Sequence, residues 1–586
     1  MSLNRNFFLN LSLVCFWYLF TYDICYANEK KGQPEKGYSK DVKSSLVSNN
    51  FMLATANPIA TKEGFKVLKN GGSAIDAVVA VQMVLNVVEP QSSGIGGGAF
   101  ILYWDAKTKK IYSFDGREKS PKTLKKDYFL NNNGERKKFW EVVQGGGSVG
   151  VPGTLRLMEF VHQRYGLMNW SQLFKPGIRL ARYGFKISPR LSESIKSAQK
   201  RGLDRFSTTR AYFFDNNNRP KLAGSKLINE PLAKTFGLIA EKGADAFYKG
   251  DIAKAIISAV KETHFNPSQL TLKDLDDYEV KVRDPVCLPY RKYNICGMGS
   301  PSSGGLTVGQ ILGILENFDL RSLGPTLESA HLFIEASKLA YADRNLYMAD
   351  KDFISVPEKG LIDKTYLLRR SRLITKTSSN KVSPGYPEGS EDLLRSLQKQ
   401  NEKPGTTHFV VVDKYGNAAS VTSTIETGFG SRVMVGGFLL NNELTDFSFI
   451  PQRNGQLIAN RLEGGKRPRS SMAPTIVLKN KKPFLITGSP GGSRIISYVA
   501  RTILAVLEWG FDPQLAINSG HIVNRNGVTE LEEGTDAIRF KEGLEARGHK
   551  VKIRNLNSGL HSILLAQDGT LIGAADPRRE GLVMGR

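Results

Sequence analysis

The sequence predicts an α+β fold, because helical and strand patterns occupy different stretches of the chain. An apolar helical segment at 73–88 is followed by two strands, at 100–104 and 111–114. Helices then alternate with loops as far as about residue 375, and a strand hairpin follows in the last third of the chain. With 586 residues, the chain is long enough for one large layered domain or for two or three ordinary ones.

Two helices open the folded part of the chain. Residues 61–69 form the first, a short one that ends at a glycine pair. The second begins at Ser73, and Asp76 three residues later completes a capping box. The segment 73–88 is apolar nearly all round and stops before Pro90, so we expect it to be buried.

The late hairpin brings two threonines together. Residues 407–412 form a β-branched strand, 413–417 a turn and 418–425 the return strand. If the turn is symmetric about its middle residue, Thr406 faces Thr424 with Cβ atoms about 4.5 to 5.5 Å apart. The two hydroxyls can then share a hydrogen bond, which a register slip of one residue would destroy.

The segment 376–405, just before the hairpin, is rich in Ser, Asn, Lys, Gly and Pro. This composition is typical of an exposed, flexible linker with one short helical piece at most.

The first 27 residues have the pattern of a secretory signal peptide. An apolar run at 7–22 follows Arg5, and Cys25-Tyr26-Ala27 places small residues at positions −3 and −1 of a cleavage site. We therefore exclude residues 1–27 from the fold and expect a periplasmic or secreted protein with no stable membrane span. A retained membrane anchor is the alternative, since the run is near the shortest length that crosses a bilayer.

Two cysteines remain after export, Cys287 and Cys296, in a strand-turn-strand segment. With the turn centred on Arg291-Lys292 they face each other, and an oxidising compartment could join them. Two reduced core cysteines are an equally good interpretation.

The formal net charge of +25 raises the question of a nucleic-acid partner. The lysines are spread along the whole chain without a basic stripe or an aromatic-basic module, so we expect a diffuse solvated surface and no nucleic acid. The histidines and the two mature cysteines show no metal-ligand spacing, so no metal is expected. The glycine loop 94–98 lacks the lysine of a phosphate-binding loop, and we expect no cofactor.

Eight blocks of sequence, in the same order, resemble the γ-glutamyltransferases of the N-terminal nucleophile hydrolase superfamily. The processing-site block is Gly405-Thr406-Thr407-His408-Phe409 followed by Val-Val-Val-Asp413. The others are VVEPQSSGIGGG ending at Gly98, DGRE around Arg117, VGVPGT ending at Thr154, PSSGG ending at Gly305, LLNNELTDFS ending at Ser448, KRPRSSMAPT ending at Thr475 and GSPGGSRI ending at Ile495. The resemblance runs from about residue 50 to the C-terminus. It implies an αββα sandwich, in which two antiparallel sheets pack face to face with helices outside.

The resemblance also implies that the chain cuts itself. Thr406 would attack the carbonyl of Gly405, where no Cβ hinders the approach, and water would open the resulting ester. The products are a large subunit, 28–405, and an associated small subunit, 406–586. The freed α-amino group, with an ordinary pKa near 8, can act as base for the hydroxyl on the same residue.

A pocket for the glutamyl head follows from the same resemblance. Arg117 would bind the α-carboxylate with two hydrogen bonds, and Ser470 and Ser471 would add hydroxyl donors. Glu443 and Asp446 would accept the α-ammonium group.

Other residues would complete the site. Thr424 would orient the nucleophile, and Gly491 and Gly492 would present N–H groups to the oxyanion. Glu426 stands where many family members carry asparagine, which adds a carboxylate near the α-ammonium. The segment 449–462 is short for a lid, which would leave the pocket open to larger substrates and to water.

The expected function is γ-glutamyl hydrolysis and transfer on glutathione-like compounds. We expect a packing or processing role for His408, because the free amine already supplies the base. An acylase of the same family, taking glutaryl or cephalosporin-type amides, is the nearest alternative. A non-processing binding protein of the envelope is another, and a nucleic-acid binder is a distant third.

Overall fold

The computed structural model describes residues 42–391, 393–398 and 405–586. The expected signal peptide lies outside the described residues. None of the helices in these ranges combines the length and the apolar character needed to cross a membrane.

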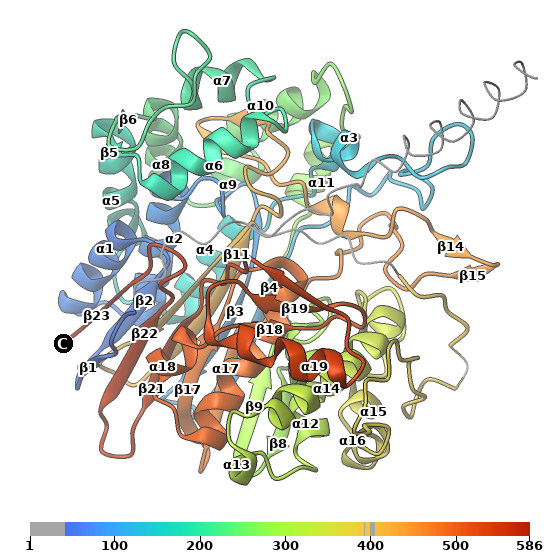
Figure 1. The fold of residues 1–586 in the computed structure, drawn as a ribbon. Coiled ribbons are helices and arrows are strands. Elements are labelled where there is room, and N and C mark those ends of the chain that lie inside the picture. Colours follow the sequence, from blue (N-terminus) through green and yellow to red (C-terminus); the bar gives the residue numbers. More distant parts are fainter. Residues whose placement is uncertain (1–41, 392, 399–404) are drawn as a thin grey trace, which may run out of the picture. The chain divides into compact units, whose positions relative to one another are not determined.

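Two seven-stranded sheets, antiparallel throughout, form the centre of the fold (Figure 1). The first sheet holds the hairpin, in the order β23 (Leu582–Gly585), β2 (Met52–Thr55), β10 (Thr406–Val412), β11 (Ala418–Thr424), β3 (Gly98–Asp105), β4 (Lys110–Gly116) and β7 (Lys281–Arg283). The second has the order β1 (Leu46–Ser48), β22 (Leu571–Ala575), β21 (His561–Leu565), β17 (Lys482–Gly488), β16 (Thr475–Lys479), β9 (Tyr293–Gly297) and β8 (Val286–Tyr290). Both sheets combine strands from before and after residue 405.

The two sheets pack against each other through a layer of buried apolar side chains. Both sheets contribute to it: Met52, Ala54, Leu102, Trp104, Val410, Val412, Ala418, Ile476, Ile486, Ile563 and Leu571. Each Val, Leu, Ile or Met side chain of this layer, once buried, stabilises the fold by about 1.5 to 3 kcal/mol relative to exposure. Because this layer joins strands from both sides of residue 405, a cut at that position would leave the two pieces sharing one core.

Helices cover the outer face of each sheet. On the first sheet lie α1 (Pro58–Lys69), α2 (Ala74–Val88) and α4 (Thr154–Tyr165), while α5 (Trp170–Tyr183) packs on α2 and α8 (Glu230–Lys242) packs on α5. On the second sheet lie α12 (Gly304–Leu315) and α17 (Ile495–Trp509), and α14 (Leu327–Tyr347) packs on α12. The predicted αββα sandwich is thereby confirmed. Every residue of α2 is buried, and its capping box forms as the sequence predicts.

The remaining elements are short. They are α3 (Phe139–Val143), β5 (Phe185–Lys186), α6 (Pro189–Gln199), α7 (Ser207–Phe213), β6 (Lys226–Leu227), α9 (Asp245–Tyr248), α10 (Asp251–Lys261), α11 (Leu272–Asp276), α13 (Leu320–Leu323), α15 (Glu358–Leu361), α16 (Lys364–Ser371), β12 (Met434–Val435), β13 (Phe438–Leu439), β14 (Gln452–Arg453), β15 (Gln456–Leu457), α18 (Pro513–Asn518), β18 (Ile522–Val523), β19 (Thr529–Glu532), α19 (Lys541–Ala546) and β20 (Val551–Arg554). The segment expected to act as a short lid contains only the two-residue strands β14 and β15.

The predicted register of the hairpin is confirmed. Thr406 pairs with Thr424, and the pairing continues without a slip to Val412 and Ala418. In the other hairpin Cys287 faces Cys296, and a disulfide joins them. Of the two interpretations open for these cysteines, the structure supports the disulfide.

Upstream of the hairpin, the described part of 376–398 forms no helix and no regular strand. It is nevertheless tied to its surroundings. Lys338 of α14 donates to the hydroxyl of Ser378 at 2.7 Å, and Asn526 donates to the carbonyl of Val382 at 2.8 Å. The buried side chain of Gln398 donates to the carbonyl of Asp446 at 3.4 Å. This stretch therefore leads the chain across α14 to the region of Asp446.

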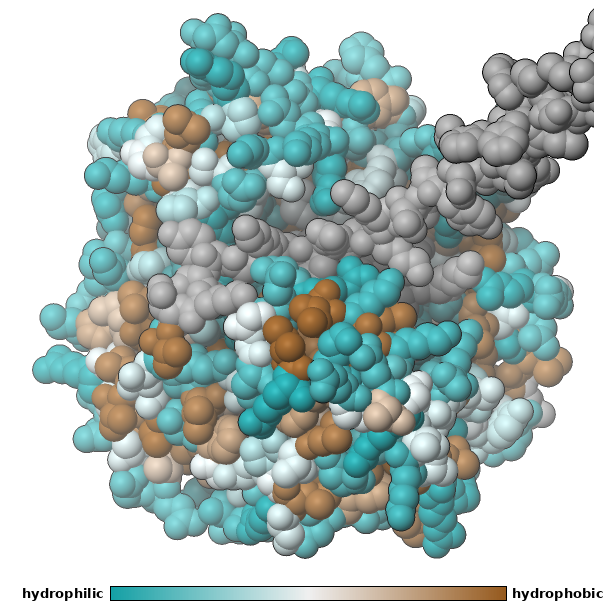
Figure 2. Space-filling view, viewed as in Figure 1, coloured by the Kyte–Doolittle hydropathy of each residue, from teal (hydrophilic) through white to brown (hydrophobic). Residues whose placement is uncertain are grey.

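On the face shown in Figure 2, hydrophilic side chains surround small, scattered groups of apolar ones. Such a mixture is ordinary for the surface of a folded protein.

Candidate active site

Thr406 is the first residue of β10, and its side chain is only 3% exposed. Its Oγ1 lies 3.1 Å from Oγ1 of Thr424. The N–H of Glu426 donates to Thr424 Oγ1 at 2.8 Å, and the Thr424 hydroxyl lies 3.2 Å from the carbonyl oxygen of Gly405, to which it can donate. Thr424 thus touches both the hydroxyl and the carbonyl that a self-cleavage at this bond would use.

Gly405 packs tightly under the loop that follows β11. A Cβ on this residue would collide with the carbonyl oxygen of Glu426 and would lie 2.6 Å from the N–H nitrogen of Gly428. Backbone atoms cannot move aside as a flexible side chain can. Glycine at 405 therefore serves the loop itself, in addition to leaving room for an attacking hydroxyl.

Arg117 is buried in an ion-pair cluster. Its guanidinium pairs with Glu443 and, at 2.6 Å, with Asp446, and it also donates to the carbonyl of Arg469 at 3.2 Å. Burial alone would lower the pKa of Arg117, but the two carboxylates raise it above its ordinary value. The structure therefore brings Arg117 to two carboxylates that lie more than 300 positions later in the sequence.

Carboxylates outnumber cations in this cluster. Glu426, Glu443 and Asp446 each place one oxygen within 4.8 Å of the others. Burial raises the pKa of Glu443 to about 8, because Arg117 offsets only part of the desolvation and Glu118 adds a like charge. A second cation would relieve this excess of negative charge, and the α-ammonium of an amino acid could provide it.

Ser470 and Ser471 lie in the segment that leads into β16, next to Arg117. The hydroxyl of Ser471 accepts a hydrogen bond from Arg344 at 2.6 Å, and that of Ser470 accepts the N–H of Met472 at 3.1 Å. Each hydroxyl is thus held in place by a donor of the protein itself.

Gly491 and Gly492 occupy the turn between β17 and α17. Their φ angles of 140° and 59° favour glycine. Gly488, at the end of β17, packs against the ring of His408, so this turn follows a strand that lies over the start of β10. Among the described residues, no acceptor is bonded to either N–H.

A family model described as gamma-glutamyltranspeptidase matches residues 60–586 of this sequence. The chain belongs to the gamma-glutamyltranspeptidase family. As a member, it is an enzyme that hydrolyses or transfers γ-glutamyl groups.

Individual relatives agree with this assignment. The chain is 41% identical to a glutathione hydrolase proenzyme of Bacillus subtilis (strain 168) over 572 residues, which cover 96% of this chain and 95% of that protein. The crystal structure of a cephalosporin acylase from Bacillus halodurans has a TM-score of 0.82 at 26% identity, covering 93% of this chain and 97% of that one. The gamma-glutamyltranspeptidase of Helicobacter pylori has a TM-score of 0.54 at 37% identity, covering 60% and 96%.

Sequence reasoning missed several residues of the site. Glu118 is fully buried, 3.7 Å from Arg117, although its place beside Arg117 in the DGRE block was a usable signal. Arg344, in the last turn of α14, donates to both Ser471 and Ser303, and no local pattern marks it. Arg579 donates to the carbonyl oxygen of Thr406 and has no local signal either.

Glu118 gives a test of the cluster through the pH dependence of stability. Burial raises the pKa of its carboxyl to about 7, and Arg117 offsets this only in part. The unfolded carboxyl titrates near 4.3, so the folded protein retains a proton that the unfolded chain loses between about pH 4.3 and 7. Stability contributed by this group is therefore lost as the pH rises through that window.

We expect Glu118→Gln to remove that loss, because the amide stays neutral at every pH. Between pH 5 and 8 the urea midpoint of the variant should fall less than that of the wild type. Urea unfolding of both proteins across this range measures the difference, and equal slopes would contradict the assigned titration.

His408 lies buried between the sheets. Its Nδ1 is 2.9 Å from the hydroxyl of Thr422, and burial together with nearby His561 lowers its pKa well below the ordinary value. A ring with so low a pKa is a weak base, and it faces Thr422 and not Thr406, which fits the expected packing role.

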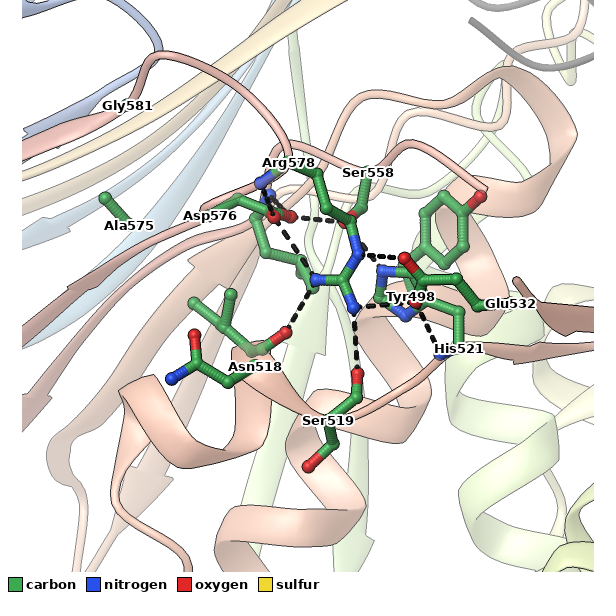
Figure 3. Close-up of polar contacts among 12 residues, drawn as sticks. Tyr498, Asn518, Ser519, His521, Glu532, Ser558, Ala575, Asp576, Arg578 and Gly581 are labelled. Carbon is green, nitrogen blue, oxygen red and sulfur yellow. Dashed lines mark hydrogen bonds and ion pairs between the residues drawn. The ribbon is translucent and has the colours of Figure 1, made fainter. Parts of the chain in front are cut away.

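A Ser, His and Asp cluster lies near the C-terminus (Figure 3). His521 Nε2 is 2.7 Å from the hydroxyl of Ser558, which in turn donates to Asp576. The serine stands between the other two, whereas a catalytic triad places histidine in the middle. All three side chains are buried, and Arg578 ties Asp576 to Glu532, so we interpret the cluster as structural.

His331, Glu335 and His549 converge in space although the sequence shows no metal-ligand spacing. The ammonium of Lys338 lies 2.6 Å from Glu335. The ring nitrogens of His331 are bonded to His549 and to the carbonyl of Thr375, both at 2.8 Å. Lys338 thus supplies the positive charge that Glu335 requires, and the cluster connects α14 with the last third of the chain.

Proposed function

We propose that this protein is an exported γ-glutamyl hydrolase and transferase whose nucleophile is Thr406, exposed by cleavage of the Gly405-Thr406 bond. The observation that carries the proposal is the pair of threonine hydroxyls at 3.1 Å, with the Gly405 carbonyl against one of them. Glutathione-like compounds are the proposed donors, since glutathione hydrolase proenzymes are among its relatives.

Maturation begins when Thr406 Oγ1 attacks the carbonyl carbon of Gly405. The C–N bond breaks, the nitrogen takes the hydroxyl proton, and an ester joins the two halves. Water then hydrolyses the ester, which leaves a carboxylate on Gly405 and a free amine and hydroxyl on Thr406. The Thr424 hydroxyl, which can donate to the Gly405 carbonyl, would stabilise the negative charge that develops there.

In the mature enzyme the free amine takes the hydroxyl proton of Thr406, and the oxygen attacks the γ-carbonyl of the substrate. Gly491 and Gly492 would donate to the oxyanion, a contact worth about 3 to 4 kcal/mol in barrier height. The leaving amine takes the proton and departs. Water or an amino acid then opens the γ-glutamyl ester and regenerates Thr406.

The glutamyl head would enter the existing ion-pair cluster. Its α-carboxylate would bind Arg117, and its α-ammonium would lie among Glu426, Glu443 and Asp446. The α-carboxylate of the substrate would thus compete with Glu443 and Asp446 for Arg117. The α-ammonium would add a second cation to the cluster. Ser470 and Ser471 would add hydroxyl donors to the carboxylate.

An acylase remains the second candidate, because the similar structure from Bacillus halodurans is titled a cephalosporin acylase. Glutaryl and γ-glutamyl anilides differ only in the α-ammonium group. We expect kcat/KM for γ-glutamyl-p-nitroanilide to exceed that for glutaryl-p-nitroanilide at least about 100-fold, since the glutaryl compound would bring its carboxylate to Arg117 without a second cation to balance Glu426, Glu443 and Asp446. Release of p-nitroaniline measures both rates.

The same comparison in Asp446→Asn controls for the pocket. Loss of one carboxylate should lower the preference for the γ-glutamyl substrate while leaving the glutaryl rate nearly unchanged. Equal rates on both substrates in the wild type would favour the acylase.

Export and assembly complete the proposal. We expect the activity in the periplasmic or secreted fraction, with the large and small fragments co-purifying because they share the layer between the sheets. The proposed reaction uses no cofactor, metal or nucleic acid.

A further inference from the structure

A buried arginine lies against the backbone of the nucleophile. Arg579 Nη1 donates to the carbonyl oxygen of Thr406 at 2.8 Å, and the side chain is 1% exposed. Strand β2 pairs with β10 only at residues 410–412. At the start of β10, the C-terminal loop that carries Arg579 thus supplies a hydrogen bond to the strand.

The loop that carries Arg579 is firmly held (Figure 3). Arg578 donates to Glu532 at 2.6 Å and to the carbonyl of Ile517 at 2.8 Å, and Asp576 accepts the N–H of Leu560 at 3.0 Å. These bonds fix the backbone on the N-terminal side of Arg579. Its guanidinium is therefore presented to Thr406 from a rigid support.

Other charged and titratable groups surround this corner. They are His408 of β10, His561 of β21, Lys43 before β1, Asp576 and Glu580 of the C-terminal loop, Glu89 after α2, Arg190 of α6 and Glu426 after β11. Glu89 is paired with Arg190, and Asp576 with Arg578. Burial lowers the pKa of His561 to about 3 and keeps both histidines neutral. Of the cations in the described part of the chain, Arg579 is the one that donates a hydrogen bond to Thr406.

We propose that Arg579 is a positioning residue for Thr406 and that its charge keeps the amine freed by cleavage in the neutral form that accepts a proton. This inference rests on the proposed function. The amine and the carbonyl oxygen belong to one residue, so the guanidinium lies roughly 6 Å from the amine. A like charge at this range disfavours the ammonium form, and the low exposure of Thr406 acts in the same direction.

The consequence is a nucleophile that is active at neutral pH. An ordinary α-amine, with a pKa near 8, is mostly protonated at pH 7, and the protonated form cannot take the hydroxyl proton. Lowering that pKa increases the fraction of enzyme whose base is ready. The rise of kcat with pH on the acid side of its pH profile, here called the acid limb, would follow this titration.

The test compares Arg579→Gln, Arg579→Lys and the wild type, each first sequenced at the start of its small fragment. We expect Arg579→Gln to move the acid limb of the kcat profile up by about one pH unit, toward the ordinary amine pKa near 8, and so to lower kcat at pH 7 about fivefold. Arg579→Lys should keep the limb near its wild-type position, because lysine keeps the charge. Arg501→Gln is the matched control, since Arg501 is a buried arginine of α17 with other charged neighbours, and its limb should not move.

Chemical rescue separates the charge from the shape of the side chain. Arg579 lines a cavity of about 430 Å³ with Lys186, Ser188 and Pro577, so guanidinium ions can reach the space that Arg579→Ala leaves. Added guanidinium should restore activity to this variant and return its acid limb toward the wild-type pH.

Equal losses at all pH values in Arg579→Gln, a shifted limb in Arg579→Lys, or absence of rescue would overturn the inference while the proposed function stands. A wild-type small fragment that does not begin at Thr406 would overturn the proposed function and this inference together.

Discussion

Replacing Thr406 by alanine is expected to leave a single uncut chain without amidase activity. Alanine has no oxygen to attack the Gly405 carbonyl, and it offers no nucleophile to a γ-glutamyl amide. Loss of the nucleophile in comparable hydrolases lowers kcat by about 10⁴-fold or more. A denaturing gel shows the state of the chain, and γ-glutamyl-p-nitroanilide measures the activity.

Two control variants test whether the losses are specific to the hydroxyl of Thr406. Thr406→Ser keeps the hydroxyl and should be cut and active at a reduced rate. Thr407→Ser alters the next residue, whose hydroxyl donates to Glu89 at 3.3 Å and not to Thr424. This variant should behave nearly as the wild type. Two fragments or ordinary turnover from Thr406→Ala would show that another group does the chemistry.

Replacing Arg117 by lysine is expected to give the second largest effect. Lysine keeps the positive charge that Glu443 and Asp446 require, so the protein should fold, but it cannot bind a carboxylate with two parallel hydrogen bonds. We expect kcat/KM for the γ-glutamyl anilide to fall about 100- to 1000-fold, mostly through KM. Steady-state kinetics measure both constants.

A substrate without the α-carboxylate tests whether that loss is specific. The 4-aminobutyryl anilide keeps the amine but has no group for Arg117 to bind, so Arg117→Lys should change its rate little. Equal losses on both substrates would mean that Arg117 acts only as the counter-charge of the cluster.

Local patterns predicted the parts of the fold that local contacts determine. The capping box of α2 and the register that joins Thr406 to Thr424 both lie within short stretches of sequence. The turn 413–417 fixes that register, because each strand can only be counted outward from it. The disulfide lies in a second hairpin, where spacing placed the cysteines opposite each other but could not decide their oxidation state.

The candidate site depended on the family resemblance, since its members come from distant segments. Arg117 meets Asp446 across more than 300 residues, and Arg579 meets Thr406 across 173. No periodicity encodes such contacts, which exist only after the two sheets have assembled. The anchoring of Ser378 by Lys338 was missed for the same reason, because composition alone describes that stretch as a free linker.

N-terminal sequencing of the small fragment from the purified wild-type protein tests the central claim most directly. The account predicts a sequence that begins Thr-Thr-His-Phe-Val, which starts at Thr406. An intact chain, or a fragment that starts at any other residue, would contradict it.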